Sequence, residues 1–169
     1  GAMSDTDAFK LIRVRGKAMQ EAYPVGGAMS AILGGEEAVI EEVCSQVEGT
    51  VSIANYNCPG QIVITGEEKA VAQAGELLKD KGVKKVVPLK VSGPFHCELM
   101  GKAADTLKKA LDETEVKKPV VPYIANFTAQ PVVEEGEIKP LLLKQLTGSV
   151  QWIKSIDFLR QQGVDSFVE

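Results

Sequence analysis

One stretch of the sequence, residues 28–91, restricts the possible folds more than any other because short apolar runs and amphipathic segments alternate along it. Apolar β-branched runs favour strands, and apolar residues spaced three and four apart favour helices. The predicted segments are strand 28–33, helix 36–47, strand 50–56, strand 61–65, helix 67–81 and strand 84–91. This βαββαβ order predicts a ferredoxin-like unit, in which two helices cover one face of an antiparallel sheet.

A helix is predicted before this unit, over residues 5–21, with Phe9, Ile12, Met19 and Ala22 near helical spacing on its apolar face. It also contains Arg13 and Arg15. Residues two apart cannot share a face of a helix, so we expect one of these arginines to point inward.

Further helices and strands are predicted after the unit. They are helix 99–111, strand 120–127, acidic loop 134–137, helices 138–146 and 151–162, and strand 164–168. A chain that ends within a strand is expected to be part of a longer protein.

The composition excludes several classes of protein. A net charge of −4 argues against a nucleic-acid binder, which needs a basic face, and no apolar run is long enough to span a membrane. The odd, widely spaced set Cys44, Cys58 and Cys97 predicts neither a disulfide framework nor a zinc site. We therefore expect a cytoplasmic protein without a metal cofactor.

The only histidine, His96, follows the last predicted strand of the unit and the loop-forming pair Gly93-Pro94. An imidazole suits acid–base catalysis near neutral pH, although a single histidine is also often structural. A histidine base needs a nucleophile, and the sequence contains no Gly-x-Ser-x-Gly motif. Neither Cys58 nor the adjacent Cys97 is well placed to serve. The residues thus indicate half of a catalytic site.

Four motifs, in matching order and spacing, resemble the malonyl-CoA:acyl carrier protein transacylases of bacterial fatty acid synthesis. The acyltransferase domains of polyketide synthases are similar, so the pathway stays open. The motifs are Arg15-Gly16-Lys17-Ala18-Met19-Gln20-Glu21-Ala22, Asn55-Tyr56-Asn57-Cys58-Pro59-Gly60-Gln61, Gly93-Pro94-Phe95-His96, and Gln145-Leu146-Thr147 through Gln151-Trp152.

The resemblance implies an α/β fold in which the ferredoxin-like unit is an insert in an α/β hydrolase-like acyltransferase subdomain. It implies three regions: residues 1–27, a cleavage scar and a helix of the larger subdomain; residues 28–91, the insert; and residues 92–169, a carboxy-terminal part of the larger subdomain. In the family a Gly-His-Ser-x-Gly motif carries the nucleophile and precedes the Arg-Gly-Lys helix. The chain therefore resembles a fragment, natural or engineered.

The resemblance also implies roles for individual residues. His96 is similar to the general base, the main-chain carbonyl of Gln145 to the group that orients it, and Arg15 to the guanidinium that binds the malonyl carboxylate. A weaker resemblance suggests further substrate contacts at Asn57, Gln61, Lys84 and Lys85, the two lysines near the phosphates of coenzyme A. Coenzyme A thioester and carrier phosphopantetheine are implied as substrates, with no separate cofactor.

The implied reaction is transfer of malonyl from malonyl-CoA to an acyl carrier protein, and this chain alone is expected to be inactive. Two alternatives stay open. In the first, the chain is a non-catalytic ferredoxin-like module that docks an acyl carrier protein or another partner. In the second, it is a structural fragment without activity.

Overall fold

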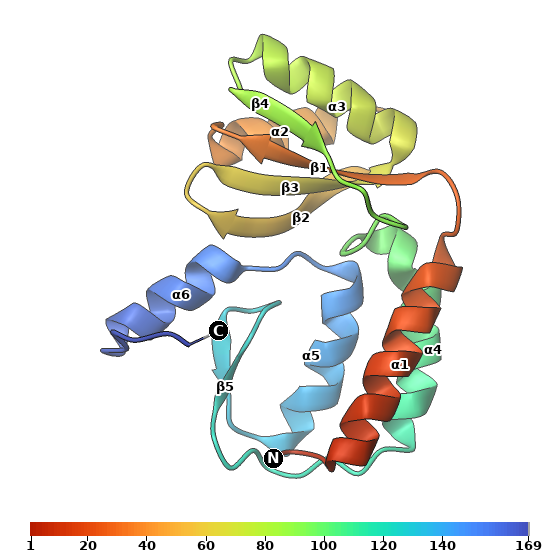
Figure 1. Ribbon diagram of the computed structural model, residues 1–169, viewed down its shortest axis with the longest axis vertical. Helices are drawn as coiled ribbons and strands as arrows, with labels where there is room; N and C mark the ends of the chain where they lie inside the picture. The colour runs from red at the N-terminus through yellow and green to blue at the C-terminus, as the bar shows by residue number, and fades with distance from the viewer. Residues whose placement is uncertain (169) are drawn as a thin grey trace.

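The computed structural model describes residues 1–168, and its upper part in Figure 1 is a four-stranded antiparallel sheet. The elements are β1 (Gly27–Leu33), α2 (Glu37–Gln46), β2 (Val51–Cys58), β3 (Gln61–Glu67), α3 (Glu68–Asp80) and β4 (Lys85–Pro88). The strand order is β2-β3-β1-β4, every neighbouring pair is antiparallel, and α2 and α3 lie together on one face. The predicted βαββαβ order is confirmed.

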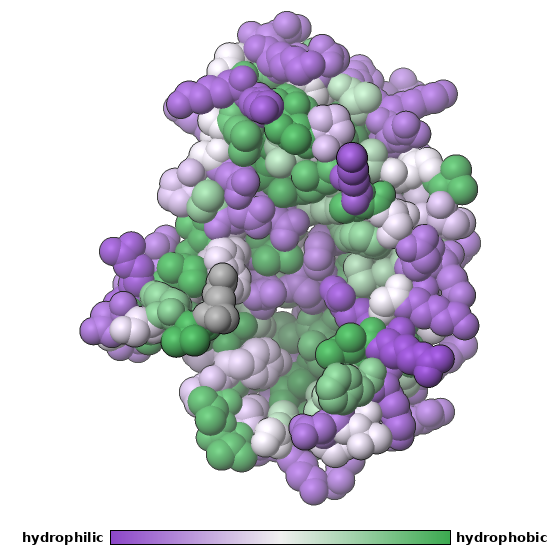
Figure 2. All heavy atoms as spheres, in the orientation of Figure 1, coloured by the Kyte–Doolittle hydropathy of each residue, from purple (hydrophilic) through white to green (hydrophobic). Residues whose placement is uncertain are grey.

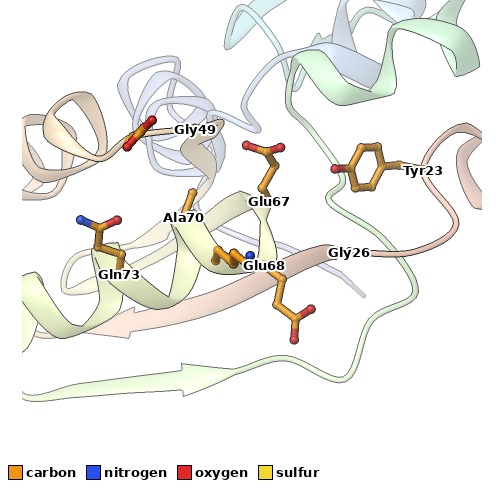
Figure 3. Close-up of a pocket in the computed structure, with 9 residues that line it drawn as sticks. Tyr23, Gly26, Gly49, Glu67, Glu68, Ala70 and Gln73 are labelled. Atoms are coloured by element: carbon orange, nitrogen blue, oxygen red, sulfur yellow. The ribbon is translucent and has the colours of Figure 1, made fainter.

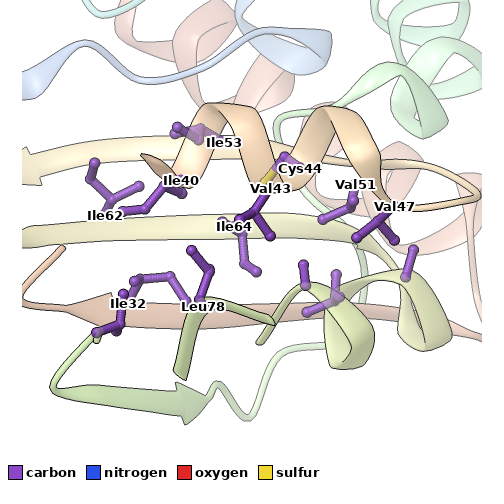
Figure 4. Close-up of a cluster of buried hydrophobic side chains, with 14 of the residues drawn as sticks. Ile32, Ile40, Val43, Cys44, Val47, Val51, Ile53, Ile62, Ile64 and Leu78 are labelled. Carbon is purple, nitrogen blue, oxygen red and sulfur yellow. The ribbon is translucent and has the colours of Figure 1, made fainter. Parts of the chain in front are cut away.

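Both faces of this sheet are covered. On the helix side, Ile32 and Ile64 of the strands pack against Ile40 and Leu78 of the helices (Figure 4). On the other side, a smaller cluster that includes Met29 of β1 packs against Phe95. The central residues of β1 are therefore buried without alternation, as expected for a strand between two layers. Phe95, the neighbour of His96, anchors the catalytic candidate to the sheet.

The remaining elements form a mainly helical part below the sheet in Figure 1. They are α1 (Asp5–Ala22), the 3₁₀ turn η1 (Glu98–Met100), α4 (Gly101–Asp112), β5 (Tyr123–Ala125), β6 (Gln130–Val132), α5 (Glu135–Thr147) and α6 (Trp152–Gln161). Leu11 of α1, Met100, Leu107 of α4 and Leu146 of α5 form its core. None of the helices in the part of the chain that the structure describes is long and apolar enough to cross a membrane.

One predicted strand, 164–168, is wrong, and another, 120–127, is too long. No strand forms over residues 164–168, where Val168 is 97% exposed and no other segment of the described chain pairs with it. Only Tyr123–Ala125 of the predicted strand 120–127 pairs, because its partner β6 is equally short. β-branched composition favours a strand, but a strand forms only where a neighbour accepts its hydrogen bonds.

Two further boundaries also differ. The predicted acidic loop 134–137 is largely the first turn of α5, where Glu135 and Glu137 interact favourably with the positive end of the helix dipole. β4 ends at Pro88 rather than at residue 91. The Leu89 nitrogen still donates to the Met29 oxygen of β1 at 2.9 Å, but the Val91 nitrogen donates to the Leu89 oxygen at 3.0 Å instead of to β1.

The apolar face predicted for α1 is buried only at its carboxy-terminal end, where Met19 lies in the core and Ala22 packs against it. Phe9 and Ile12 are 75% and 67% exposed, whereas Leu11 faces α4 and is buried. Ile12 and Leu11 line a hollow of about 250 Å³ with Leu107, Leu142 and other residues of α4 and α5. Green, hydrophobic side chains surround a hollowed region in the lower half of Figure 2. The helical part thus presents an uncovered apolar surface.

Candidate active site

His96 is held in place by buried residues on both sides of it in the chain. Pro94 and Cys97 are almost fully buried, and the Cys97 thiol donates a hydrogen bond to the Pro94 carbonyl at 3.2 Å. The backbone of His96 lies in the left-handed region, with φ of 64°. Such a conformation is uncommon for residues other than glycine and is often found at functional sites. The surrounding packing therefore fixes where the imidazole lies.

The imidazole of His96 is oriented by the end of α5. Its Nδ1 lies 2.9 Å from the main-chain oxygen of Gln145. Because a carbonyl oxygen can only accept, Nδ1 carries the proton and donates it to this hydrogen bond. In the neutral ring Nε2 then holds the lone pair. A histidine in this tautomer is prepared to accept a proton at Nε2.

Several interactions set the pKa of His96. Burial lowers the pKa of His96 below the ordinary value of 6.5, and the hydrogen bond with the Gln145 carbonyl opposes this. The positive charge of Arg15 lowers the pKa further, and an interaction with the main chain of Gly148 raises it. The net effect is a lowered pKa. The ring is therefore neutral at neutral pH, as a general base must be.

This lowered pKa predicts a pH dependence of stability. Below pH 6.5 the unfolded chain binds a proton at His96 that the folded chain resists, so the free energy of unfolding should decrease as the pH falls through this range. Urea denaturation from about pH 5 to 8, compared with His96→Asn, measures this contribution. Asparagine tolerates the left-handed backbone and does not titrate. A proton NMR titration placing the pKa of this single histidine at or above 6.5 would contradict the prediction.

Arg15 is half-buried on α1, whereas Arg13 is exposed, so the expectation that one arginine points inward is confirmed. Within residues 1–168, Arg15 forms no salt bridge with a carboxylate. Burial lowers the pKa of its guanidinium, but an arginine in a protein remains charged. Arg15 and Gln145 line the same hollow of about 250 Å³. A half-buried cation without a carboxylate partner is suited to bind an anionic group of a substrate.

His96 also borders a polar hollow of about 420 Å³ between the sheet and the end of α5. The residues around it include Thr50, Glu98 and Ser149, which the sequence analysis missed. The Thr50 hydroxyl donates to the Glu98 carboxylate at 3.1 Å. No sequence pattern connects Thr50 with His96, whereas Glu98 is two residues from His96 and Ser149 lies within the motif that runs from Gln145 to Trp152.

The four weaker candidates lie at the other end of the sheet. β1 begins at Gly27, which lies so close to Pro94 of the His96 loop that any side chain at position 27 would clash. It ends at Leu33, which pairs with Gln61 and Lys85. Seven residues of strand separate these ends by about 20 Å. Asn57 lies next to the β2–β3 turn at this end, and Lys84 borders a separate hollow of about 540 Å³. The structure thus brings His96, Gln145 and Arg15 together, but not these four residues.

With this geometry established, comparison with known proteins identifies the family. The model of the acyl transferase domain family matches residues 1–164. The chain belongs to the acyl transferase family. The match covers both the sheet and the helical part, and hence all seven residues predicted for the site.

Two relatives of the chain are malonyl transacylases. The malonyl CoA-acyl carrier protein transacylase of Bacillus subtilis is 47% identical over 173 residues, which cover 100% of this chain and 55% of that protein. An acyl carrier protein S-malonyltransferase from Vibrio cholerae O1 has a TM-score of 0.95 and 41% identity, over 97% of this chain and 55% of that one. The chain spans about half the length of these relatives.

A third similar structure is a malonyl-transacylase in complex with its type II polyketide synthase acyl carrier protein. It has a TM-score of 0.93 and 40% identity, over 96% of this chain and 54% of that one.

Another hollow of this acyl transferase chain, about 450 Å³ in volume, lies beside the start of α3 (Figure 3). Glu67, Glu68 and Tyr23 are among its lining residues, and none of the predicted site residues is. Glu67 instead accepts a hydrogen bond from the main-chain nitrogen of Thr50 at 2.7 Å. Across residues 1–168, no group of three or more His, Cys, Asp or Glu side chains is arranged to hold a metal ion.

Proposed function

We propose that this chain supplies the histidine and arginine of a malonyl transfer from malonyl-CoA to an acyl carrier protein. The observation that carries the proposal is the 2.9 Å contact between Nδ1 of His96 and the Gln145 carbonyl, which leaves Nε2 as a base. The names of the relatives support malonyl-CoA and an acyl carrier protein as substrates, and the transacylase–carrier complex supports the second of them.

The proposed mechanism has two half-reactions. Both use a serine from the part of the related transacylases that this chain does not cover. Nε2 of His96 removes the proton of the serine hydroxyl as the serine oxygen attacks the malonyl thioester carbon. The carbon–sulfur bond breaks, and the imidazolium returns the proton to the sulfur of coenzyme A. The phosphopantetheine thiol of the carrier then attacks the serine ester by the same steps in reverse order, which regenerates the serine and the neutral imidazole.

Arg15 supplies the proposed selectivity for malonyl. A planar guanidinium binds a carboxylate through two charge-assisted hydrogen bonds. The partial burial of Arg15 strengthens both bonds. Burial lowers the pKa of His96 most, and the positive charge of Arg15 lowers it further, so both favour the neutral base. We retain Asn57, Gln61, Lys84 and Lys85 only as proposed contacts to a distant part of an extended substrate, since they lie away from His96.

We also retain the boundaries 1–27, 28–91 and 92–169, and a cytoplasmic location, as proposals. The separate apolar cores of the sheet and of the helical part support the division. The free thiols of Cys44, Cys58 and Cys97 are compatible with a reducing compartment.

Covalent labelling tests the proposed function. This chain alone should acquire no stable label from radiolabelled malonyl-CoA, because a base without a nucleophile cannot form an acyl-enzyme. A hybrid transacylase, in which this chain replaces the matched segment of the Bacillus subtilis relative, 55% of that protein, should be labelled. Stable malonylation of the chain alone would contradict the proposal. A folded hybrid that binds the carrier protein but takes no label would instead favour the non-catalytic binding module.

A further inference from the structure

The turn that follows α5 is joined to β2 by three hydrogen bonds. The hydroxyl of Ser149 donates to the main-chain oxygen of Ile53 at 2.6 Å. The main-chain nitrogen of Val150 donates to the oxygen of Ala54 at 2.7 Å, and the nitrogen of Tyr56 donates to the oxygen of Val150 at 2.9 Å. Residues far apart in the sequence thus connect the helical part of the molecule to the sheet (Figure 1).

The geometry of β2 explains why it accepts this turn. β2 is an outer strand of the sheet, so one row of its main-chain groups has no partner within the sheet. The pairing of β2 with β3 also shifts register between Ile53 and Asn55, which is the mark of a β-bulge. The carbonyls of Ile53 and Ala54 lie at this bulge, in buried residues, where an unpaired oxygen would be costly. Ser149 and Val150 supply the two donors.

The same turn is tied to the group that orients His96. The side-chain amide nitrogen of Gln145 donates to the main-chain oxygen of Gly148 at 2.9 Å and to that of Ser149 at 3.4 Å. The main-chain oxygen of Gln145 accepts the hydrogen bond from Nδ1 of His96. A continuous series of hydrogen bonds therefore runs from β2 through Ser149 and Gln145 to the imidazole. His96 and Ser149 also border the same hollow.

We propose that Ser149 is a positioning residue for His96. By fastening the turn to the β2 bulge, its hydroxyl holds the end of α5 where the Gln145 carbonyl meets Nδ1, and so maintains the tautomer with a free Nε2. The inference rests on the proposed function only in treating His96 as a base. The position and tautomer of the ring can be measured without substrate, so failure of the inference and failure of the function are distinguishable.

The experiment uses the whole chain with ¹⁵N-labelled histidine. Because His96 is the only histidine, its two ring nitrogens report the ratio of the Nδ1–H to the Nε2–H tautomer without assignment. The unchanged chain should show the Nδ1–H form. Ser149→Ala removes one hydrogen bond and leaves the two main-chain bonds to β2, so it should fold and lower the tautomer ratio by about fivefold.

Two variants separate positioning from simple loss of stability. Ser155→Ala deletes another buried serine hydroxyl, which donates to the Gln151 carbonyl at 2.8 Å in α6, and should leave the tautomer ratio unchanged. Ser149→Thr keeps a hydroxyl and should restore the ratio. The proposal is overturned if Ser149→Ala lowers the urea midpoint while the ratio stays that of the unchanged chain, or if Ser155→Ala lowers the ratio equally.

Discussion

Replacing Arg15 with alanine in the hybrid transacylase is expected to lower kcat/KM for malonyl-CoA by about 30- to 1000-fold. The loss of a charge-assisted, bidentate contact to a carboxylate costs on the order of 2–4 kcal/mol, which corresponds to this range. Within residues 1–168 no carboxylate forms a salt bridge with Arg15, so under the proposed function the contact that the change removes is the one to the malonyl carboxylate. Steady-state kinetics with malonyl-CoA measure the effect.

Acetyl-CoA is the internal control for Arg15→Ala, because it has no carboxylate to lose. Its turnover should fall little or rise, since a half-buried cation without a counterion disfavours a neutral acyl group. The ratio of the two activities is insensitive to the amount of folded enzyme. Arg13→Ala, an exposed arginine two residues away on the same helix, should change neither activity. If Arg15→Ala lowers both activities by the same factor, Arg15 is structural.

The sheet and its two helices were predictable because each segment carries its own periodicity. The two-residue turn Pro59-Gly60 joins Cys58 to Gln61 and so fixes the pairing of β2 with β3, and the spacing of Ile40 and Val43 indicates the buried face of α2. These signals are local, so each can be recognised without knowledge of distant residues.

The errors occur where the outcome depends on a distant partner. Residues 164–168 have the composition of a strand but no strand to pair with among the described residues. Phe9 and Ile12 form a second apolar stripe on α1, and only the stripe that meets α4 is buried. Sequence periodicity identifies apolar faces, whereas tertiary contacts decide which of them is covered.

The site was predictable in part, and chiefly through the family resemblance. The chemistry of the residues singled out His96, but the pairing with Gln145 came from motif order, and the structure places the two in contact. Ser149 lies within the motif that runs from Gln145 to Trp152, and Glu98 is two residues from His96, but no pattern connects Thr50 with His96. The contact of Ser149 with the sheet follows from the β2 bulge and the turn after α5, which periodicity does not encode.

Replacing His96 with asparagine in the hybrid transacylase is expected to slow malonyl transfer by about 10²- to 10⁴-fold, the usual contribution of a general base. Asparagine suits this backbone, with its φ of 64°, better than alanine does, so loss of activity should not reflect misfolding. The expected loss lies in acylation of the serine rather than in binding of malonyl-CoA, so KM should change little. Circular dichroism and binding of malonyl-CoA are the controls.

The most direct test of the account is the rate of covalent label formation when hybrid transacylase and radiolabelled malonyl-CoA are mixed and quenched in a single turnover. With His96 present, the rate should rise with pH as a single group titrates with a pKa below 6.5. With His96→Asn, the rate should be lower by about 10²- to 10⁴-fold and should no longer depend on the titration of this group. Equal rates and equal pH dependence for the two proteins would contradict the account, because they would show that His96 is not the base.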